Sequence, residues 1–180
     1  MVPAIFLDRD GVIIENRPNY VRSWEDVHIY PQALTALASI NNGPFKIIIV
    51  TNQSAVGRGL ISLKTANIIN QRLITEIEQH GGRIDRVFMC PHAPDESCNC
   101  RKPQPGLILR AEKELSLDLK RSIMIGDSLS DIQSGQTAGI ARTMLVRTGR
   151  GVEQANLRIS SGLKPFQIFD TLSEALHSIK

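Results

Sequence analysis

The chain has 180 residues, enough for one domain with its own hydrophobic core and short for two. Hydrophobic residues make up 42% and charged residues 22% of the chain, an ordinary balance for a soluble globular protein. A net charge of +3 without a long basic block argues against nucleic acid as a partner. Apolar runs as short as that at 47–50 argue against a membrane span, which needs roughly 20 apolar residues.

The start of the chain and its cysteines indicate a compartment. The chain enters an apolar strand pattern almost at once, without the charged, apolar and small-residue regions of a secretory signal. All three cysteines crowd into residues 90–100 instead of being spread as a disulfide framework would be. We therefore expect a cytoplasmic protein, with a monomer as the default oligomeric state.

Strand patterns alternate with helical patterns along the whole chain, which favours an α/β fold in three layers, a doubly wound parallel sheet between two layers of helices. The expected strands are 4–7, 46–50, 86–89, 122–125 and 143–146, with a sixth candidate at 166–169. The expected helices are 32–40, 63–80, 106–115, 131–138 and 172–179. The helix at 63–80 is the clearest, because its apolar residues recur at helical spacing between the candidate N-cap Ser62 and Gly81-Gly82.

Two carboxylates, Asp8 and Asp10, follow the first strand and precede Gly11. In an extended chain they point the same way, and like charges held that close need a cation or a shared proton. Taken alone, the pair is equally consistent with two solvated residues in a loop. With the segments described next, it favours phosphoryl chemistry, in which Mg²⁺ bridges a carboxylate and a phosphate. Asp8 would then be the nucleophile and Asp10 the general acid and base.

Polar residues also follow the second, third and fourth strands. Thr51-Asn52-Gln53-Ser54 offers hydroxyls and amides to phosphate oxygens, and Lys102 offers a positive charge. Asp127 follows the fourth strand directly, while Asp131 either completes a metal shell or caps the next helix. Because the carboxyl ends of parallel strands meet at one edge of the sheet, we expect one pocket there.

The cysteines lie in a C-x-H-x5-C-x-C arrangement that is formed by Cys90, His92, Cys98 and Cys100. Three thiolates and one imidazole are a closed tetrahedral ligand set, typical of structural Zn²⁺. A disulfide or free thiols are the alternatives, although Cys98 and Cys100 are too close for an unstrained disulfide. We expect a zinc-binding loop at 90–100 that fixes the position of Lys102.

Four motifs together resemble those of the haloacid dehalogenase superfamily of phosphatases: Asp8-x-Asp10-Gly11, Thr51-Asn52, Lys102-Pro103 and Gly126-Asp127-x3-Asp131. The resemblance implies a Rossmann-like sheet and Mg²⁺-dependent hydrolysis through an aspartyl phosphate on Asp8. It implies that Asp10 protonates the leaving alcohol and then activates water. Thr51 and Lys102 would hold the phosphoryl oxygens, while Asp8, the backbone carbonyl of Asp10, and Asp127 would bind Mg²⁺.

The cysteine segment narrows the resemblance to a zinc-bearing branch of the superfamily that acts on heptose bisphosphates or on histidinol phosphate. Residues 51–59 and 145–149 resemble the heptose group, whereas the short spacer between His92 and Cys98 is closer to the histidinol group. Val12 and Ser128 depart from common family patterns, which bears on the substrate more than on the reaction. The resemblance favours D-glycero-D-manno-heptose 1,7-bisphosphate, hydrolysed at the 7-phosphate, with histidinol phosphate as the alternative.

The pocket would be shaped by loops. Only about forty residues separate Asp8 from Thr51, so no separate cap domain fits between them. We expect Asn52, Gln53 and Ser54 to contact the substrate. Arginines suit phosphate geometry, and the candidates for binding a second phosphate are Arg58, Arg101 and Arg147, the last being equally an ordinary surface residue.

A phosphorylatable receiver-like signalling domain is the alternative from another class, because it also combines acids, a threonine and a lysine on a parallel sheet. A receiver usually accepts phosphate after its third strand, whereas here the acidic pair follows the first. An inactive, zinc-bound binding module is disfavoured by the intact set of acids and Lys102.

Overall fold

The computed structural model describes residues 1–157 and 162–179 as an α/β fold in three layers. Its sheet has six strands in the order β3-β2-β1-β4-β5-β6, and every neighbouring pair is parallel. The strands are β1 (Ala4–Leu7), β2 (Lys46–Asn52), β3 (Arg86–Cys90), β4 (Ile123–Gly126), β5 (Arg142–Val146) and β6 (Gln167–Phe169). The expected doubly wound parallel sheet is confirmed.

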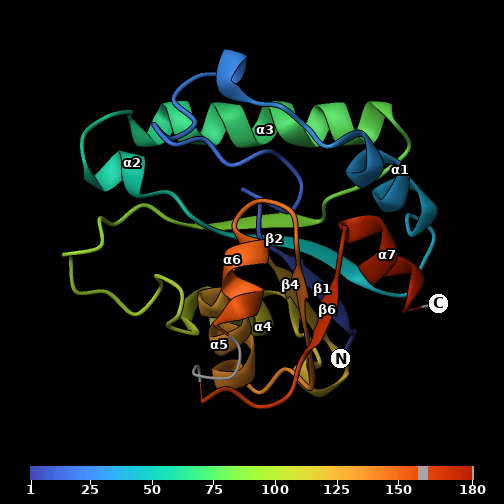
Figure 1. Ribbon diagram of the computed structural model, residues 1–180. Helices are drawn as coiled ribbons and strands as arrows, with labels where there is room; N and C mark the ends of the chain where they lie inside the picture. The colour runs from blue at the N-terminus through green and yellow to red at the C-terminus, as the bar shows by residue number, and fades with distance from the viewer. Residues whose placement is uncertain (158–161, 180) are drawn as a thin grey trace.

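Side chains alternate between the two faces of the central strands, which are buried on both sides as in other covered parallel sheets. In β1, Ile5 and Leu7 belong to one apolar cluster and Ala4 and Phe6 to the other. Helices α1 (Pro31–Ser39), α3 (Leu63–Gln79) and α7 (Leu172–His177) contribute to the first cluster, and α4 (Gly106–Leu115) contributes to the second. Figure 1 shows α1 and α3 on one side of the sheet and α4 and α5 (Leu129–Ala138) on the other.

Helix α3 begins and ends at the expected signals. The Ser62 hydroxyl accepts a bond from the Thr65 amide at 3.0 Å, and Gly81, with φ +81°, follows the C-cap His80. Its buried apolar stripe of Ala66, Ile69, Leu73 and Ile77 packs on the sheet, with the polar Asn70 buried among them.

Two short helices were not expected from the sequence. Helix α2 (Ser54–Gly57) follows β2 after one residue, and α6 (Gly151–Asn156) lies between β5 and β6, where no helix was expected. Both are too short to show a helical period. Strand β2 also continues two residues beyond the expected end, and α5 begins at Leu129 instead of Asp131.

The segment between β1 and β2 holds a 3₁₀ turn (Trp24–Asp26) and α1, which packs on the sheet. No separate cap is evident in residues 1–157 and 162–179, as expected. None of the described helices is long and apolar enough to cross a membrane.

Truncating Leu73 to alanine is expected to lower the free energy of unfolding by about 2–5 kcal/mol, because the side chain is fully buried under α3 and its loss leaves a cavity. Leu63→Ala on the same helix is the matched control, since Leu63 is 49% exposed and its loss should change stability by no more than about 0.5 kcal/mol. Chemical denaturation measures both. Equal effects would contradict the assignment of the buried face.

Candidate active site

Asp8 lies immediately after β1, the strand between β2 and β4 in the sheet, and is 6% exposed. Its Oδ1 accepts a bond from the Arg9 amide at 2.8 Å and an ion pair from Lys102 Nζ at 2.8 Å. Burial raises the pKa of Asp8 to about 6, although Lys102 opposes that shift. A carboxylate that is ionised near neutral pH and paired with a cation suits a nucleophile.

Lys102 is 4% exposed, and both its side-chain ammonium group and its backbone have fixed partners. Its Nζ contacts the Val50 carbonyl at 2.7 Å, Asp8 at 2.8 Å and Asp131 Oδ1 at 2.6 Å. The Asn52 side chain bonds both the amide and the carbonyl of Lys102, each at 3.0 Å. Burial acts to lower the pKa of Lys102, but the carboxylates of Asp131 and Asp8 outweigh it and raise that pKa. The lysine therefore stays charged.

Three buried acids cluster in the site. Carboxylate oxygens of Asp8, Asp127 and Asp131 lie within 4.8 Å of one another. Asp127 is fully buried, and its Oδ2 accepts bonds from Asn16 Nδ2 at 2.6 Å and the Arg150 amide at 2.8 Å. Its buried Oδ1 has no hydrogen-bond partner among the residues that the structure describes, although Arg150 Nη2 forms an ion pair with it at 3.6 Å. Burial and then the charge of Asp8 raise the pKa of Asp127. The three clustered carboxylates are the kind of oxygen ligands that a divalent cation binds.

Asp131 combines parts of the two roles considered from the sequence. Its Oδ2 accepts a bond from the Ser128 amide at 3.1 Å, while its Oδ1 pairs with Lys102. Ser128 is the N-cap of α5, so Asp131 is the partner at the third helical position of a capping box, not the cap itself. The helix start thereby fixes one of the two carboxylates that hold the lysine.

Asp10 is partly exposed and belongs to a second network. Both of its oxygens accept bonds from the Arg9 guanidinium, at 3.0 and 3.1 Å, and Oδ2 also accepts one from Gln53 Nε2 at 2.9 Å. Gln53 Nε2 also donates to the Thr51 hydroxyl at 2.8 Å. Arg9 was not singled out from the sequence, where its place between two acids is the only signal.

A cavity of about 550 Å³ opens over these groups, and its lining includes Asp8, Asp10, Asn52, Gln53, Ser54 and Lys102. Of the three arginines considered for a second phosphate, only Arg101 lines it. Arg147 instead pairs with Asp170 at 2.6 Å, because its backbone continues the pairing with β6. Arg58 is the exposed C-cap of α2 and is not among the lining residues. Arg17 and Arg150 line the cavity and were not anticipated.

Cys90, His92, Cys98 and Cys100 come together as expected, with ligand atoms within 4.8 Å of one another. All three cysteines are free, so the disulfide alternative is not adopted. The His92 Nδ1 lies 3.3 Å from the Cys100 sulfur and 3.5 Å from the Cys90 sulfur. Three sulfurs and one imidazole nitrogen around one point are a ligand set that fits structural zinc.

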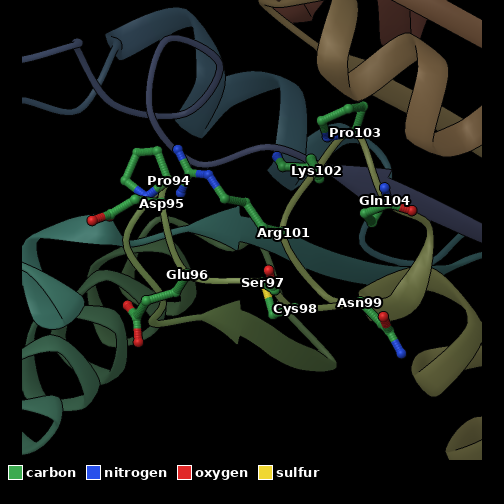
Figure 2. Close-up of a pocket in the computed structure, with 10 residues that line it drawn as sticks. All are labelled: Pro94, Asp95, Glu96, Ser97, Cys98, Asn99, Arg101, Lys102, Pro103 and Gln104. Carbon is green, nitrogen blue, oxygen red and sulfur yellow. The ribbon is translucent and has the colours of Figure 1, made fainter.

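This loop carries Arg101 and Lys102 directly after its last cysteine. Figure 2 shows the Arg101 side chain extending back toward Pro94. Arg101 Nη1 donates to the His92 carbonyl at 3.3 Å. A second cavity of about 510 Å³ lies along residues 94–104 and shares Arg101 and Lys102 with the first.

The parallel sheet and the acid cluster define a hydrolase of the HAD-like class. A HAD-hydrolase-like family model matches residues 99–175. A D-glycero-beta-D-manno-heptose-1,7-bisphosphate 7-phosphatase of Photorhabdus laumondii is 37% identical, over 89% of this chain and 91% of the relative. One of Bordetella bronchiseptica is 39% identical, over 82% of each. The chain belongs to the HAD-like phosphatase family that includes these heptose bisphosphate phosphatases, which confirms the resemblance.

A solved structure supports the same family. The crystal structure of D,D-heptose 1,7-bisphosphate phosphatase from B. bronchiseptica, complexed with magnesium and phosphate, matches with a TM-score of 0.91 and 33% identity. The match covers 98% of this chain and 97% of that one. A second relative from Photorhabdus laumondii is named D-glycero-alpha-D-manno-heptose-1,7-bisphosphate 7-phosphatase, after the other anomer of the sugar. It is 39% identical over 82% of this chain and 84% of that relative. The relatives thus include phosphatases named for both anomers.

Replacing Lys102 by methionine is expected to lower the free energy of unfolding by about 3–5 kcal/mol, because Asp8 and Asp131 would be left buried without a counter-charge. The carboxyls of the variant protonate more readily, so this deficit should grow as the pH rises above about 6 and shrink as the pH falls. Denaturant unfolding at several pH values measures it.

Lys46→Met is the matched control for Lys102. Lys46 pairs with Asp85 at 2.8 Å, but its side chain is 46% exposed, and water screens such a pair. Its loss should cost below about 1 kcal/mol. A Lys102 variant as stable as the Lys46 variant would contradict the role given to the buried ion pairs.

Proposed function

We propose that this chain is a Mg²⁺-dependent phosphatase that removes the 7-phosphate of D-glycero-D-manno-heptose 1,7-bisphosphate. The observation that carries the proposal is the buried Asp8, which pairs with Lys102 at 2.8 Å and clusters with the carboxylates of Asp127 and Asp131. Relatives at 37% and 39% identity carry the name of this phosphatase. A matching structure binds magnesium and phosphate, which supports the same chemistry here.

Asp8 acts as the nucleophile. A carboxylate oxygen of Asp8 forms a bond to phosphorus while the bond between phosphorus and the sugar oxygen breaks, which leaves an aspartyl phosphate. Asp10 gives a proton to the departing sugar oxygen and later takes one from the attacking water. That water displaces Asp8 from phosphorus, so inorganic phosphate leaves and both acids return to their starting states.

The phosphoryl group is held from two sides. Lys102 supplies positive charge beside Asp8, which opposes the charge on the transferring oxygens. The Thr51 hydroxyl accepts a bond from Gln53, which leaves its own hydrogen for a phosphoryl oxygen. Mg²⁺ would be held by Asp8, Asp127 and the Asp10 carbonyl, and it would neutralise charge between the nucleophile and the phosphate.

The charge of the cavity favours a bisphosphate. Arg17, Arg101 and Arg150 line it together with Lys102, and guanidinium groups bind phosphate through paired hydrogen bonds. We assign the second phosphate of the substrate to this basic wall, with Asn52, Gln53 and Ser54 nearer the reacting group. Histidinol phosphate carries an amine in place of a second phosphate, so the same wall would repel it.

We propose that Zn²⁺ binds Cys90, His92, Cys98 and Cys100 as a structural ion. Support comes from the four converging ligand atoms and from the free state of the cysteines. The ion would fix residues 90–100, and Lys102 follows that loop by two residues. Its role is therefore to hold the lysine in place and not to activate water.

We further infer that residues 1–180 form one phosphatase domain and that the enzyme works as a monomer in the cytoplasm. Its expected ligand is a phosphorylated sugar, with neither nucleic acid nor a membrane as a partner. The inference rests on one sheet that carries both apolar clusters and on cysteines that remain thiols.

The proposed substrate is tested by measuring phosphate release from heptose 1,7-bisphosphate and from histidinol phosphate side by side in Mg²⁺ buffer. We expect kcat/KM to favour the bisphosphate, because only that substrate can use the basic wall. Preference for histidinol phosphate would overturn the substrate assignment and leave the mechanism intact.

The proposed mechanism predicts different losses at the two acids. Asp8→Asn should abolish Mg²⁺-dependent phosphate release, because an amide oxygen is a poor nucleophile. Asp10→Asn should slow release by roughly 10²–10⁴-fold, the usual contribution of a general acid and base. Steady-state kinetics measures both, and near-normal turnover of Asp8→Asn would rule out the nucleophile assignment.

Zinc removal has its own expected outcome. The purified chain should contain roughly one zinc ion per molecule by elemental analysis, and Cys98→Ala should lose zinc and activity together. Ser97→Ala, at the exposed neighbouring residue of the same loop, should keep both. A fully active preparation without zinc would remove the structural role.

A further inference from the structure

Arg9 is the largest fully buried side chain of the described residues, with 1% of its surface exposed. It stands between the two acids of the first motif, one residue from each. A charged group is buried at high cost unless its donors find acceptors, so the partners of Arg9 show what this residue does.

The guanidinium makes four hydrogen bonds. Its Nε and Nη2 form a fork on the two oxygens of Asp10, at 3.0 and 3.1 Å. Its Nη2 also donates to Gln53 Oε1 at 2.9 Å, and its Nη1 donates to Asn70 Oδ1 at 2.8 Å. A forked pair fixes the plane of a carboxylate as well as its position.

Asn70 gives this network an anchor outside the cavity. It lies on α3, is 6% exposed, and interrupts the apolar stripe that packs on the sheet. Its amide nitrogen lies 3.7 Å from the Met89 sulfur, and its oxygen faces Arg9. Asn70 is not among the residues that line the cavity, and the hydrogen bonds that connect it to Asp10 run through the guanidinium of Arg9.

The hydrogen bonds distinguish the two oxygens of Asp10. Oδ2 accepts from Arg9 Nε and from Gln53 Nε2, which uses both of its lone pairs. Within the described residues, Oδ1 accepts a hydrogen bond from Arg9 Nη2 alone, which leaves it one lone pair. A carboxyl group otherwise turns easily about its last bond. The fork therefore keeps Oδ1 as the oxygen that can carry a proton.

We propose that Arg9, held by Asn70, is a positioning residue that orients Asp10 so that its Oδ1 transfers the proton. The inference rests on the proposed function. In the first step the proton leaves Oδ1 for the sugar oxygen as the bond from phosphorus to that oxygen breaks. In the second step Oδ1 takes a proton from water as the water oxygen bonds to phosphorus and Asp8 leaves.

Asn70→Leu tests the proposal, because it removes the acceptor for Arg9 without touching the cavity. The readout is kcat/KM for two substrates with Mg²⁺ present, heptose 1,7-bisphosphate and 4-nitrophenyl phosphate. The sugar leaving group needs a proton, whereas nitrophenolate leaves without one. We expect kcat/KM to fall by roughly ten- to a hundredfold for the sugar and by less than about threefold for the aryl ester.

Asn67→Leu is the matched control, since Asn67 lies one turn earlier on α3 and is exposed. It should leave both substrates unaffected. Asn70→Asp keeps an oxygen acceptor for Arg9 and should restore most of the activity on the sugar. A purely structural role of Asn70 would lower kcat/KM for the two substrates equally, and that result would overturn the proposal.

Arg9→Lys provides a second test if Asn70→Leu does not fold. Lysine keeps the positive charge but cannot form the fork, so the same selective loss on the sugar is expected. An equal loss on both substrates would again refute positioning. Failure of the proposed function is separate, because it appears as a wild-type enzyme that releases no phosphate from heptose 1,7-bisphosphate.

Discussion

A single buried ammonium group organises the site. Lys102 Nζ is closed in by the Val50 carbonyl, Asp8 and Asp131, which belong to or follow β2, β1 and α5. A charge that is cut off from water needs every one of these partners, and two buried carboxylates need the lysine in return. The three segments therefore cannot shift independently. The capping box of α5 and the Asn52 side chain brace this arrangement, so catalytic geometry and local folding depend on the same contacts.

The loops around the ammonium group form a second layer of support. Gly57, at the end of α2, donates its amide to the Pro91 carbonyl at 2.7 Å, and the Gln53 amide donates to the Cys90 carbonyl at 2.8 Å. A Cβ at Gly57 would stand 2.4 Å from the Ala93 nitrogen, so only glycine allows this close approach. The segment that follows β2 is thus packed directly on the proposed zinc loop. The residues proposed to contact the substrate and those proposed to bind zinc therefore lie on two segments in direct contact, although these are far from each other along the chain.

The sequence was sufficient to predict the strands, the main helices and the acids at the strand ends, because each depends on short-range patterns. The placement of Asp8 and Lys102 in one pocket followed from the rule that parallel strands end at one edge, whereas their direct pairing is a finding of the structure. The partners of Asp127 did not, since Asn16 and Arg150 come from loops whose paths no local pattern specifies. Arg147 was a candidate for the second phosphate from the sequence, but the pairing of its backbone with β6 places its side chain on Asp170. Asn70 could not be predicted for a different reason. In the sequence it is one polar residue within an apolar helical stripe, and its role becomes visible only from its hydrogen bond to the buried Arg9.

Loop residues line much of the cavity, together with Ser54 of α2 and Asp131 of α5, and no separate cap is evident among the described residues. No domain movement is needed to bring Asp8 and Lys102 together, because they are already paired at 2.8 Å. In the proposed function, discrimination between ligands rests on the arginines that line the cavity. Their attraction for phosphate acts over about a Debye length and weakens as salt is added. An open cavity of this kind gives less selectivity than an enclosed one, but substrate and product enter and leave it freely. Substitutions in the loops that line it would change which sugar is preferred, while the acids at the strand ends stay the same.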